Sequence, residues 1–466
     1  EISESHSSSF FATLFIFLCI CCVIIQYFQF KGSSTLITTP EFKKFQVVYL
    51  SVYFLAVISD WLQGPYVYAL YDYYNFSKQE IGMLFIVGFG SSMIFGTFAG
   101  SWADKYGRRL SCQIYCILYG VSCLTKHSPS FYVLLFGRLT GGIATSILFS
   151  SFESWLVSEH NKRIFPAEWL SQTFTLATVG NGVMAILAGQ MGAFVRDAFS
   201  SLVAPFDLAI FFLMVALAII STQWSENKGD SSSSSSSVER GDSRAKLQIA
   251  LDTLRRDPKV LLLGLIQSSF EGSMYIFVFM WTPKLEPLFP NLPHGQVFGC
   301  FMACMMIGSS CVRYLLASRL PALYMRDVFA VAALSLALPS IIATSGPLTL
   351  SSFCVFEAIC GIYWPSMGIV KSKYVPEEVR ATMYNLFRIP LNLIVVIVLS
   401  NLGAISDDAV FATCAFLLAG AALMQHVFFT MVKAEDKREA GVSMSAVPPS
   451  PSGAAGKADP DGITPA

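Results

Sequence analysis

Five ionisable residues lie near the middle of segments that are otherwise apolar. They are Asp60, Arg138, Glu271, Glu357 and Arg388. At a rise of 1.5 Å per residue, each lies at least about 10 Å from either end of its segment. A charge at that depth in a bilayer costs at least about 2.5 kcal/mol, so it needs a partner or a water-filled cavity. Five such groups exceed what helix packing requires, and they predict a path for a polar solute.

The composition indicates that these segments are membrane helices. The 466 residues are 54% hydrophobic and 13% charged, about half the charge density of a soluble domain, which is roughly 25%. The 31 basic residues balance 31 acidic ones, so no bulk charge favours nucleic acid as a partner. All 12 cysteines fall in apolar stretches, so we expect neither a disulfide framework nor a metal site. We expect an all-α protein whose partner is the lipid bilayer.

Thirteen segments reach the length of about 20 apolar residues that crosses roughly 30 Å of hydrocarbon, or come close to it. They are residues 9–30, 45–70, 81–103, 110–125, 131–157, 169–195, 206–224, 259–282, 296–316, 327–344, 348–369, 381–403 and 409–432. The first segment lacks the basic start and the small-residue cleavage site of a signal peptide. We therefore expect an extra N-terminal transmembrane helix followed by twelve core helices.

The distribution of basic residues predicts the orientation. Of the 31 Lys and Arg residues, 23 fall in the connections and the tail on one side of the predicted spans and 4 in the connections on the other. Because basic residues stay cytoplasmic, we expect the N-terminus outside and the C-terminus in the cytoplasm. An incorrect number of spans would scramble this alternation, so the split also supports the count.

The chain is expected to divide into two homologous six-helix bundles, at 45–224 and 259–432. Residues 1–44 would hold the extra helix and a cytoplasmic link. The segment 225–258 contains a run of seven serines and should be a disordered linker, as should the tail 433–466. Asp60 matches Glu271 and Arg138 matches Glu357, at similar offsets of 211 and 219. Carriers built from repeats bind substrate between the halves, near the bilayer midplane.

A ten-residue motif follows the second core helix. The sequence from Gly100 to Arg109 reads GSWADKYGRR, which resembles the G-x-x-x-D-[RK]-x-G-[RK]-[RK] signature of the major facilitator superfamily. The resemblance implies the major facilitator fold, in which two bundles rock about a central site. Gly100 should let helices approach closely, and the arginines should pair with an acid, of which Glu153 is the best candidate. The expected gating loop comprises Gly100, Asp104, Gly107, Arg108, Arg109 and Glu153. The alternative is that these are simply basic residues retained inside.

Three further stretches carry a closer resemblance. They are Asp60–Leu70 (DWLQGPYVYAL), Phe152–Trp155 (FESW) and Asn385–Asn392 (NLFRIPLN), and they resemble the molybdate-anion transporter family. The resemblance covers nearly all of residues 10–432. It implies a multi-pass carrier in the plasma membrane that brings molybdate into cells. The substrate follows from this resemblance alone, and no cofactor is implied.

Molybdate is a tetrahedral dianion, so its binding requires guanidinium and amide donors. Arg138 and Arg388 come from opposite halves and are the expected ligands of the oxyanion. Gln63, Asn385 and Asn392 are expected to complete the hydrogen bonds. The alternative is that each arginine pairs with an acid on a neighbouring helix and only orients the bundle.

The three buried acids Asp60, Glu271 and Glu357 would repel an anion if they were ionised. We therefore hypothesise that one of them carries a proton that enters with the anion. The alternative is that they neutralise the two arginines as static pairs.

Two further features concern the helices themselves. Trp364-Pro365 is expected to break the tenth core helix locally, and Tyr66 and Tyr68 belong to an aromatic belt or line an outer gate.

Other functions remain open from the sequence. The same fold could carry a sugar or another small solute with protons, and sulfate or phosphate would suit the arginines as well as molybdate does. A non-transporting receptor is a third alternative, against which the signature loop and the buried charges argue. No phosphate loop, nucleophile elbow or zinc motif is present, so we expect neither catalytic residues nor an enzyme.

Overall fold

The computed structural model describes residues 2–31, 38–228, 247–341 and 345–445. Within these ranges every regular element is a helix, and twelve helices are long and apolar enough to cross a membrane. This confirms the expected all-α membrane protein. The serine run and residues 446–466 lie outside the described residues.

The first bundle begins at residue 40. Its helices are α2 (Pro40–Trp61), α3 (Val67–Tyr73), α4 (Lys78–Tyr106), α5 (Arg108–Leu124), α6 (Phe131–Lys162), α7 (Ala167–Phe199) and α8 (Ala204–Gln223). With 17 residues, α5 falls outside the twelve apolar helices, but it packs against α6 and α8. Its buried stripe of Cys112, Tyr115, Cys116 and Tyr119 faces these neighbours. It therefore corresponds to the expected segment 110–125 and, with the twelve apolar helices, accounts for the thirteen expected segments.

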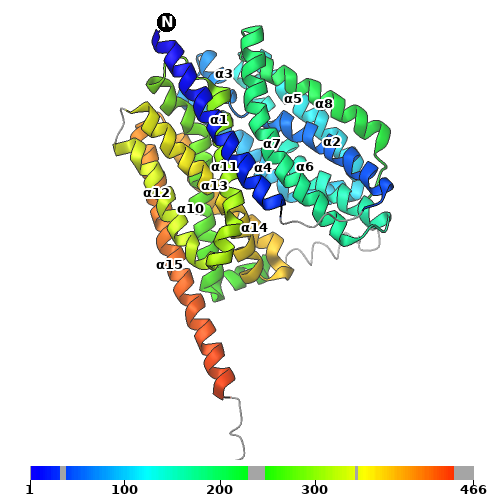
Figure 1. Ribbon diagram of the computed structural model, residues 1–466, viewed down its shortest axis with the longest axis vertical. Coiled ribbons are helices and arrows are strands. Elements are labelled where there is room, and N and C mark those ends of the chain that lie inside the picture. Colours follow the sequence, from blue (N-terminus) through cyan, green and yellow to red (C-terminus); the bar gives the residue numbers. More distant parts are fainter. Residues whose placement is uncertain (1, 32–37, 229–246, 342–344, 446–466) are drawn as a thin grey trace, which may run out of the picture.

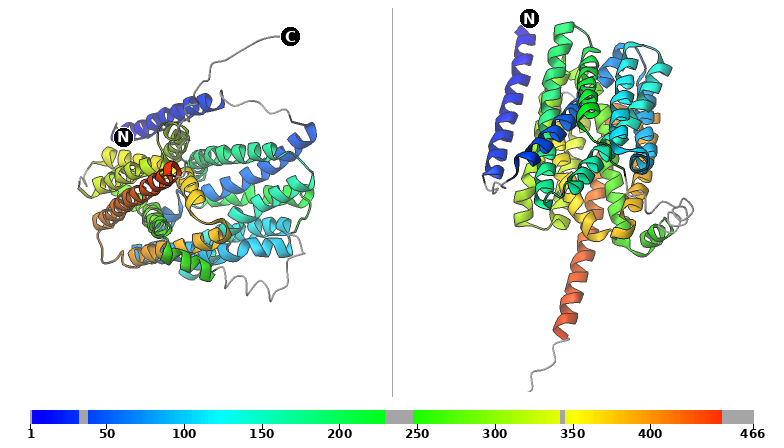
Figure 2. Two further views of the ribbon diagram at one scale, coloured as in Figure 1. Left: turned by 90° about the horizontal axis from the view of Figure 1, so that it is seen from below. Right: turned by 90° about the vertical axis from the view of Figure 1, so that its right-hand side faces the viewer.

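The second bundle follows the linker. Its helices are α10 (Pro258–Leu285), α11 (His294–Ser318), α12 (Pro321–Ile341), α13 (Gly346–Tyr374), α14 (Arg380–Ser400) and α15 (Asp407–Ser445). They pack mainly on one another, and the two bundles meet where α7 contacts α11 and where α4 contacts α14. Figure 1 shows the two bundles side by side, and Figure 2 shows the same arrangement from below.

The extra helix α1 (Ile2–Phe30) lies against the second bundle, on the face shown in Figure 1. Gln26 Nε2 donates to Ser310 Oγ at 2.8 Å, and Gln29 Nε2 donates to the Ser310 carbonyl at 2.7 Å. Near the other end of α1, the Phe11 ring packs on Phe289. The N-terminus and the end of α15 lie at opposite ends of the molecule (Figure 1), as an odd number of spans requires.

The structure differs from the expectation at two prolines, one where a continuous helix was expected and one where a break was expected. The segment 45–70 is not one helix, because α2 ends at Trp61 and α3 begins at Val67. Pro65 lacks a backbone N–H and its ring opposes helix continuation. By contrast, α13 runs unbroken through Pro365, so the expected break there is wrong. At Gly361 a Cβ would lie 2.0 Å from the Met305 carbonyl of α11, and neighbouring helices can hold a membrane helix straight past a proline.

The linker and the tail contain more regular structure than expected. Residues 247–256 are helical, and α15 continues to Ser445. The helical stretch 247–256 reads LQIALDTLRR, and its Ala250 is buried while Leu254 packs against the core. This amphipathic pattern provides a physical reason for the helix. The expectation of disorder over all of 225–258 and 433–466 is therefore wrong for these described parts.

Candidate substrate site

A cavity of about 340 Å³ lies between the two bundles, roughly ten times the ~30 Å³ that one water molecule occupies in the liquid. Side chains from α2, α4, α5 and α6 line it on one side, and side chains from α10 and α14 on the other. Its polar lining consists of Asp60, Gln63, Ser92, Tyr119, Ser122, Arg138, Thr145, Tyr275, Arg388 and Asn392. The structure therefore brings together four of the five residues expected to bind substrate, together with one of the three acids.

Arg138 of α6 is fixed by neutral groups of α4. Its Nε donates to the Leu84 carbonyl at 3.1 Å, and its guanidinium carbon lies 4.7 Å from the centre of the Phe85 ring. The side chain passes directly over Gly88, where a Cβ would lie 2.5 Å from Nη2. Among the described residues, no carboxylate lies within ion-pair distance of Arg138. The arginine thus brings to the cavity a positive charge that no described carboxylate neutralises in an ion pair.

Arg388 of α14 reaches the cavity from the second bundle. Its side chain lies in the same cavity lining as Tyr275, and its Nη1 would lie 3.7 Å from a Cβ at Gly96 of α4. Asn392 Nδ2 donates to the Arg388 carbonyl at 2.6 Å. Within the described ranges Arg388 also lacks an ion pair. The alternative that both arginines form static pairs is therefore not the arrangement that the structure shows.

The break between α2 and α3 places Gln63 beside the cavity. Gln63 is 7% exposed, and its Nε2 is buried without a hydrogen-bond partner, so it is a donor available to a ligand. One turn earlier, Asp60 accepts a hydrogen bond from the Tyr119 hydroxyl. Sequence reasoning missed Tyr119 and Tyr275, because aromatic residues in membrane helices are most often packing or interfacial groups.

The other predicted site residues lie elsewhere. Asn385 is exposed and is absent from the cavity lining. Glu357 is buried within the second bundle, where its Oε2 has no partner. Glu271 lies one turn along α10 from Tyr275 and accepts a hydrogen bond from the Tyr363 hydroxyl at 2.9 Å.

A second cavity, of about 540 Å³, lies on the other side of Trp61. It is bounded by α1, α7, α11 and α13, and its described lining contains amides, hydroxyls, thioethers and indoles but no charged side chain. The Trp61 indole donates to Asn181 Oδ1 at 2.7 Å and lines both cavities. Of these two cavities, only the first is lined by positively charged side chains.

The two bundles are joined at the end that bears α3. The ring centre of Phe279 lies 5.1 Å from the ring centres of Tyr68 and Phe85, so aromatic side chains of the two bundles pack together here. Lys78 of α4 pairs with Asp407 of α15 at 2.8 Å. Burial and the nearby Glu286 carboxylate raise the pKa of Asp72, whereas Lys78 lowers it. Lys78 thus offsets repulsion between acids of the two bundles, and the cavity is closed at this end.

The bundles separate at the opposite end, where the signature loop lies. A Cβ at Gly100 would meet no atom within 4 Å, so the expected close approach at this glycine is absent. Nearby, Phe98 and Trp102 of α4 are 61% and 65% exposed. The contacts between α4 and α14 lie farther toward the α3 end, where a Cβ at Gly82 would be 2.8 Å from the Leu399 carbonyl.

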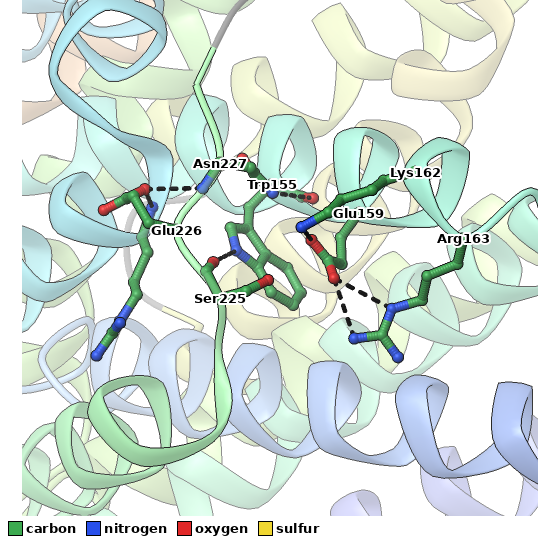
Figure 3. A network of polar contacts seen from close by, with 8 residues as sticks. Trp155, Glu159, Lys162, Arg163, Ser225, Glu226 and Asn227 are labelled. Atoms are coloured by element: carbon green, nitrogen blue, oxygen red, sulfur yellow. Dashed lines mark hydrogen bonds and ion pairs between the residues drawn. The ribbon is translucent and has the colours of Figure 1, made fainter.

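Glu226, rather than Glu153, is the acid that engages the signature loop (Figure 3). Its carboxylate accepts from the backbone N–H groups of Arg109 and Leu110 at 2.9 and 3.1 Å. Arg108 pairs with Asp104 at 2.8 Å. Glu153 lines a polar pocket together with Arg108 but forms no ion pair with any described residue. The expected pairing with Glu153 is therefore wrong.

Glu226 reaches the signature loop because the chain after α8 folds back across α5 and α6. Trp155 Nε1 donates to the Ser225 carbonyl at 2.8 Å, and Asn227 Nδ2 donates to the Trp155 carbonyl at 3.3 Å (Figure 3). Trp224 stacks on Trp155 with ring centres 3.7 Å apart. These contacts hold Glu226 at the start of α5, where a helix has unsatisfied N–H groups and a positive dipole end.

Gly107 makes this approach possible. Its φ of 130° is unfavourable for other residues, and a Cβ there would lie 2.6 Å from the carboxyl carbon of Glu226. The second glycine of the signature is therefore required both by its backbone conformation and by the close contact with Glu226.

Two helical bundles around one polar cavity, closed at one end and separated at the other, define a secondary carrier of the major facilitator fold. Solved structures of such carriers superpose on the chain. A nucleoside transporter, NupG, gives a TM-score of 0.63 at 12% identity, covering 82% of this chain and 99% of that one. A POT family transporter gives 0.68 at 11% identity, covering 84% and 96%. These likenesses show the fold.

Residues 10–356 match the model of a family described as sugar transporters with 12 transmembrane helices. The molybdate-anion transporter of Xenopus tropicalis is 36% identical over 415 residues, which covers 86% of this chain and 89% of that protein. That of Danio rerio is 33% identical over 438 residues, covering 86% and 90%. The chain therefore belongs to the molybdate-anion transporter family, whose members are transporters rather than enzymes.

Proposed function

We propose that this protein carries molybdate into the cell by alternating access, in the plasma membrane, with its N-terminus outside and its C-terminus in the cytoplasm. The relatives named molybdate-anion transporter support the substrate. The excess of basic residues on the signature-loop side supports the orientation. In this orientation the closed α3 end faces outward, and the structure corresponds to an inward-facing state.

The observation that carries the proposal is the pair of arginines facing one cavity from opposite bundles. Arg138 and Arg388 each lack an acidic partner among the described residues. A guanidinium offers a planar set of donors that matches the oxygens of an oxyanion. The amides of Gln63 and Asn392 add neutral donors beside them. Because the ligands belong to both bundles, a bound oxyanion would draw the two halves together, as alternating access requires.

We further propose that Asp60 is the acid that carries a coupled proton. Of the three acids considered, Asp60 lines the cavity, where it accepts from Tyr119. An ionised Asp60 would repel a dianion, so its protonation would favour loading. We expect Asp60→Asn to transport molybdate with a rate that no longer changes between acidic and neutral medium. A pH dependence equal to that of the unmodified protein would exclude Asp60 from this role.

The function is tested by uptake in cells that lack their own molybdate carriers, at nanomolar molybdate and with sulfate as competitor. We expect Arg138→Ala and Arg388→Ala each to lower uptake at least about tenfold, because each removes a charge-assisted contact. Arg313→Ala is the matched control, since Arg313 donates to the Gln29 carbonyl outside the cavity. Undiminished uptake by both cavity variants at equal surface level would contradict the site. Uptake of a sugar that neither substitution reduced would support a neutral substrate instead.

A further inference from the structure

A column of polar side chains runs along α10 from the cavity toward the signature-loop end. Gln267, Glu271 and Tyr275 follow one another at intervals of four residues, which places them on one face of the helix. Tyr275 lines the cavity together with Arg388. Glu271 and Gln267, one and two turns farther along, are only 5% and 4% exposed. The column thus continues from the proposed substrate site into the interior of the second bundle.

Lys371 of α13 meets the buried end of this column. Its Nζ donates to Gln267 Oε1 at 3.2 Å and lies 4.8 Å from the centre of the Tyr384 ring. Gln267 stands four residues before Glu271 on the same face of α10, a spacing at which two helical side chains are neighbours. The Gln267 amide therefore lies between the ammonium of Lys371 and the carboxylate of Glu271.

The charges along the column alternate in sign, in the order Arg388, Glu271, Lys371. In the described structure neither cation forms an ion pair with Glu271. A buried carboxylate requires compensation by charge and hydrogen bonds. Glu271 accepts a hydrogen bond from the Tyr363 hydroxyl, and the charge of Lys371 lies on the far side of the neighbouring Gln267 amide. It therefore does not need to bind Arg388.

We propose that Lys371 is a positioning residue for substrate binding. By compensating Glu271 through Gln267, Lys371 keeps the guanidinium of Arg388 free for an oxyanion. The inference rests on the proposed role of Arg388 as a ligand, and Lys371 itself does not line the cavity. If the charge of Lys371 were removed, Glu271 would be left with Arg388 as its compensating cation. The resulting buried pair would compete with the substrate.

The test compares the kinetics of molybdate uptake by Lys371→Met with those of the double variant Glu271→Gln/Lys371→Met. We expect Lys371→Met to raise KM at least about tenfold while Vmax stays within about twofold. In the double variant no carboxylate competes for Arg388, so KM should return to within about threefold of the starting value. A KM unchanged in Lys371→Met, or a double variant as impaired as the single one, would overturn the inference. Lys373→Met is the control, because Lys373 is exposed two residues away.

A cryo-EM structure of purified Lys371→Met supplies a readout that does not depend on transport. We expect the Glu271 carboxylate to move to within about 4 Å of the Arg388 guanidinium, the usual limit of an ion pair. A Glu271 that stays against Tyr363 would overturn the inference even if molybdate is transported. If the movement occurs but the unmodified protein carries no molybdate, the proposed function fails while the compensation of Glu271 by Lys371 stands.

Discussion

At the scale of single residues, the proposed site depends on two cations that form no ion pair with any described residue. Arg138 is oriented by a carbonyl and an aromatic face, and Arg388 shares the cavity lining with Tyr275. Contacts of this kind fix a guanidinium without neutralising it, whereas an ion pair would already have satisfied the charge. The difference between a structural arginine and an anion-binding arginine therefore lies in its partners.

Gly88 provides the space in which Arg138 lies, so its substitution should displace the arginine. In Gly88→Ala the added Cβ would lie 2.5 Å from Nη2 and 2.8 Å from the guanidinium carbon. We expect molybdate uptake to fall at least about tenfold, because small misplacements of a binding group have large effects. Gly90→Ala is the control on the same helix, since a Cβ there meets no atom within 4 Å. Equal uptake by the two variants would contradict this role of Gly88.

The sequence predicts part of the site because a charge in an apolar segment is conspicuous. Arg138, Arg388 and Asp60 stand out in this way, and all three line the cavity. Glu271 and Glu357 stand out equally but lie outside the lining, because mid-depth on a helix does not specify which way a side chain faces. Partners such as Tyr119 could not be predicted, since a tyrosine in a membrane helix usually serves packing.

At the scale of elements, the segment that follows α8 has a structural role that its place in the linker conceals. Residues 224–228 fold back so that Glu226 accepts from the first N–H groups of α5. This interaction sets the end of the signature loop, which also bears the Asp104–Arg108 pair. The loop is therefore held within the first bundle in this state.

Removing the Glu226 carboxylate should destabilise the start of α5. We expect Glu226→Ala to lower the free energy of unfolding by about 0.5–2 kcal/mol, the usual effect of losing a helix N-cap. Thermal unfolding of the detergent-solubilised protein measures this. Glu153→Ala is the control, because Glu153 borders the same pocket as Glu226 but forms no ion pair with any described residue. A larger loss of stability in Glu153→Ala would favour the pairing that the sequence suggested.

The elements also show how far the sequence could predict the fold. Its hydrophobic segments correspond to the observed helices, including the extra N-terminal one. The two prolines show the limit. Pro65 ends a helix and Pro365 does not, although both stand in apolar segments. The outcome depends on tertiary packing, such as the close contact of α13 with α11 at Gly361, which the local sequence does not reveal.

At the scale of the whole molecule, the two bundles touch at one end and separate at the other. The contacts at the α3 end include the Lys78–Asp407 pair, the ring of Phe279 against Tyr68, and a close approach of α7 to α11 at Gly189. At the other end, Gly100 faces open space. Rocking the bundles about the cavity would separate them at the α3 end and bring them together at the other end. Gly100 would then allow α4 to approach the second bundle.

The Lys78–Asp407 pair should favour the state that is closed at the α3 end. The pair is partly exposed, so Lys78→Ala should shift the equilibrium by no more than about 1 kcal/mol, or fivefold. The measurement is the rate at which an impermeant maleimide, added outside, labels Val67→Cys in the cavity lining. We expect faster labelling in Lys78→Ala and in Asp407→Ala, and recovery in the charge-reversed Lys78→Asp/Asp407→Lys. Identical rates in all four backgrounds would show that the pair does not hold this end closed.

The central claim is that an oxyanion binds between Arg138 and Arg388. A cryo-EM structure of the purified protein with molybdate tests it most directly, because molybdenum scatters strongly. The account predicts density within about 3 Å of donors from both arginines, as charge-assisted hydrogen bonds require, and loss of that density in Arg388→Ala. Density elsewhere, or density in the cavity that persists in Arg388→Ala, would contradict the account.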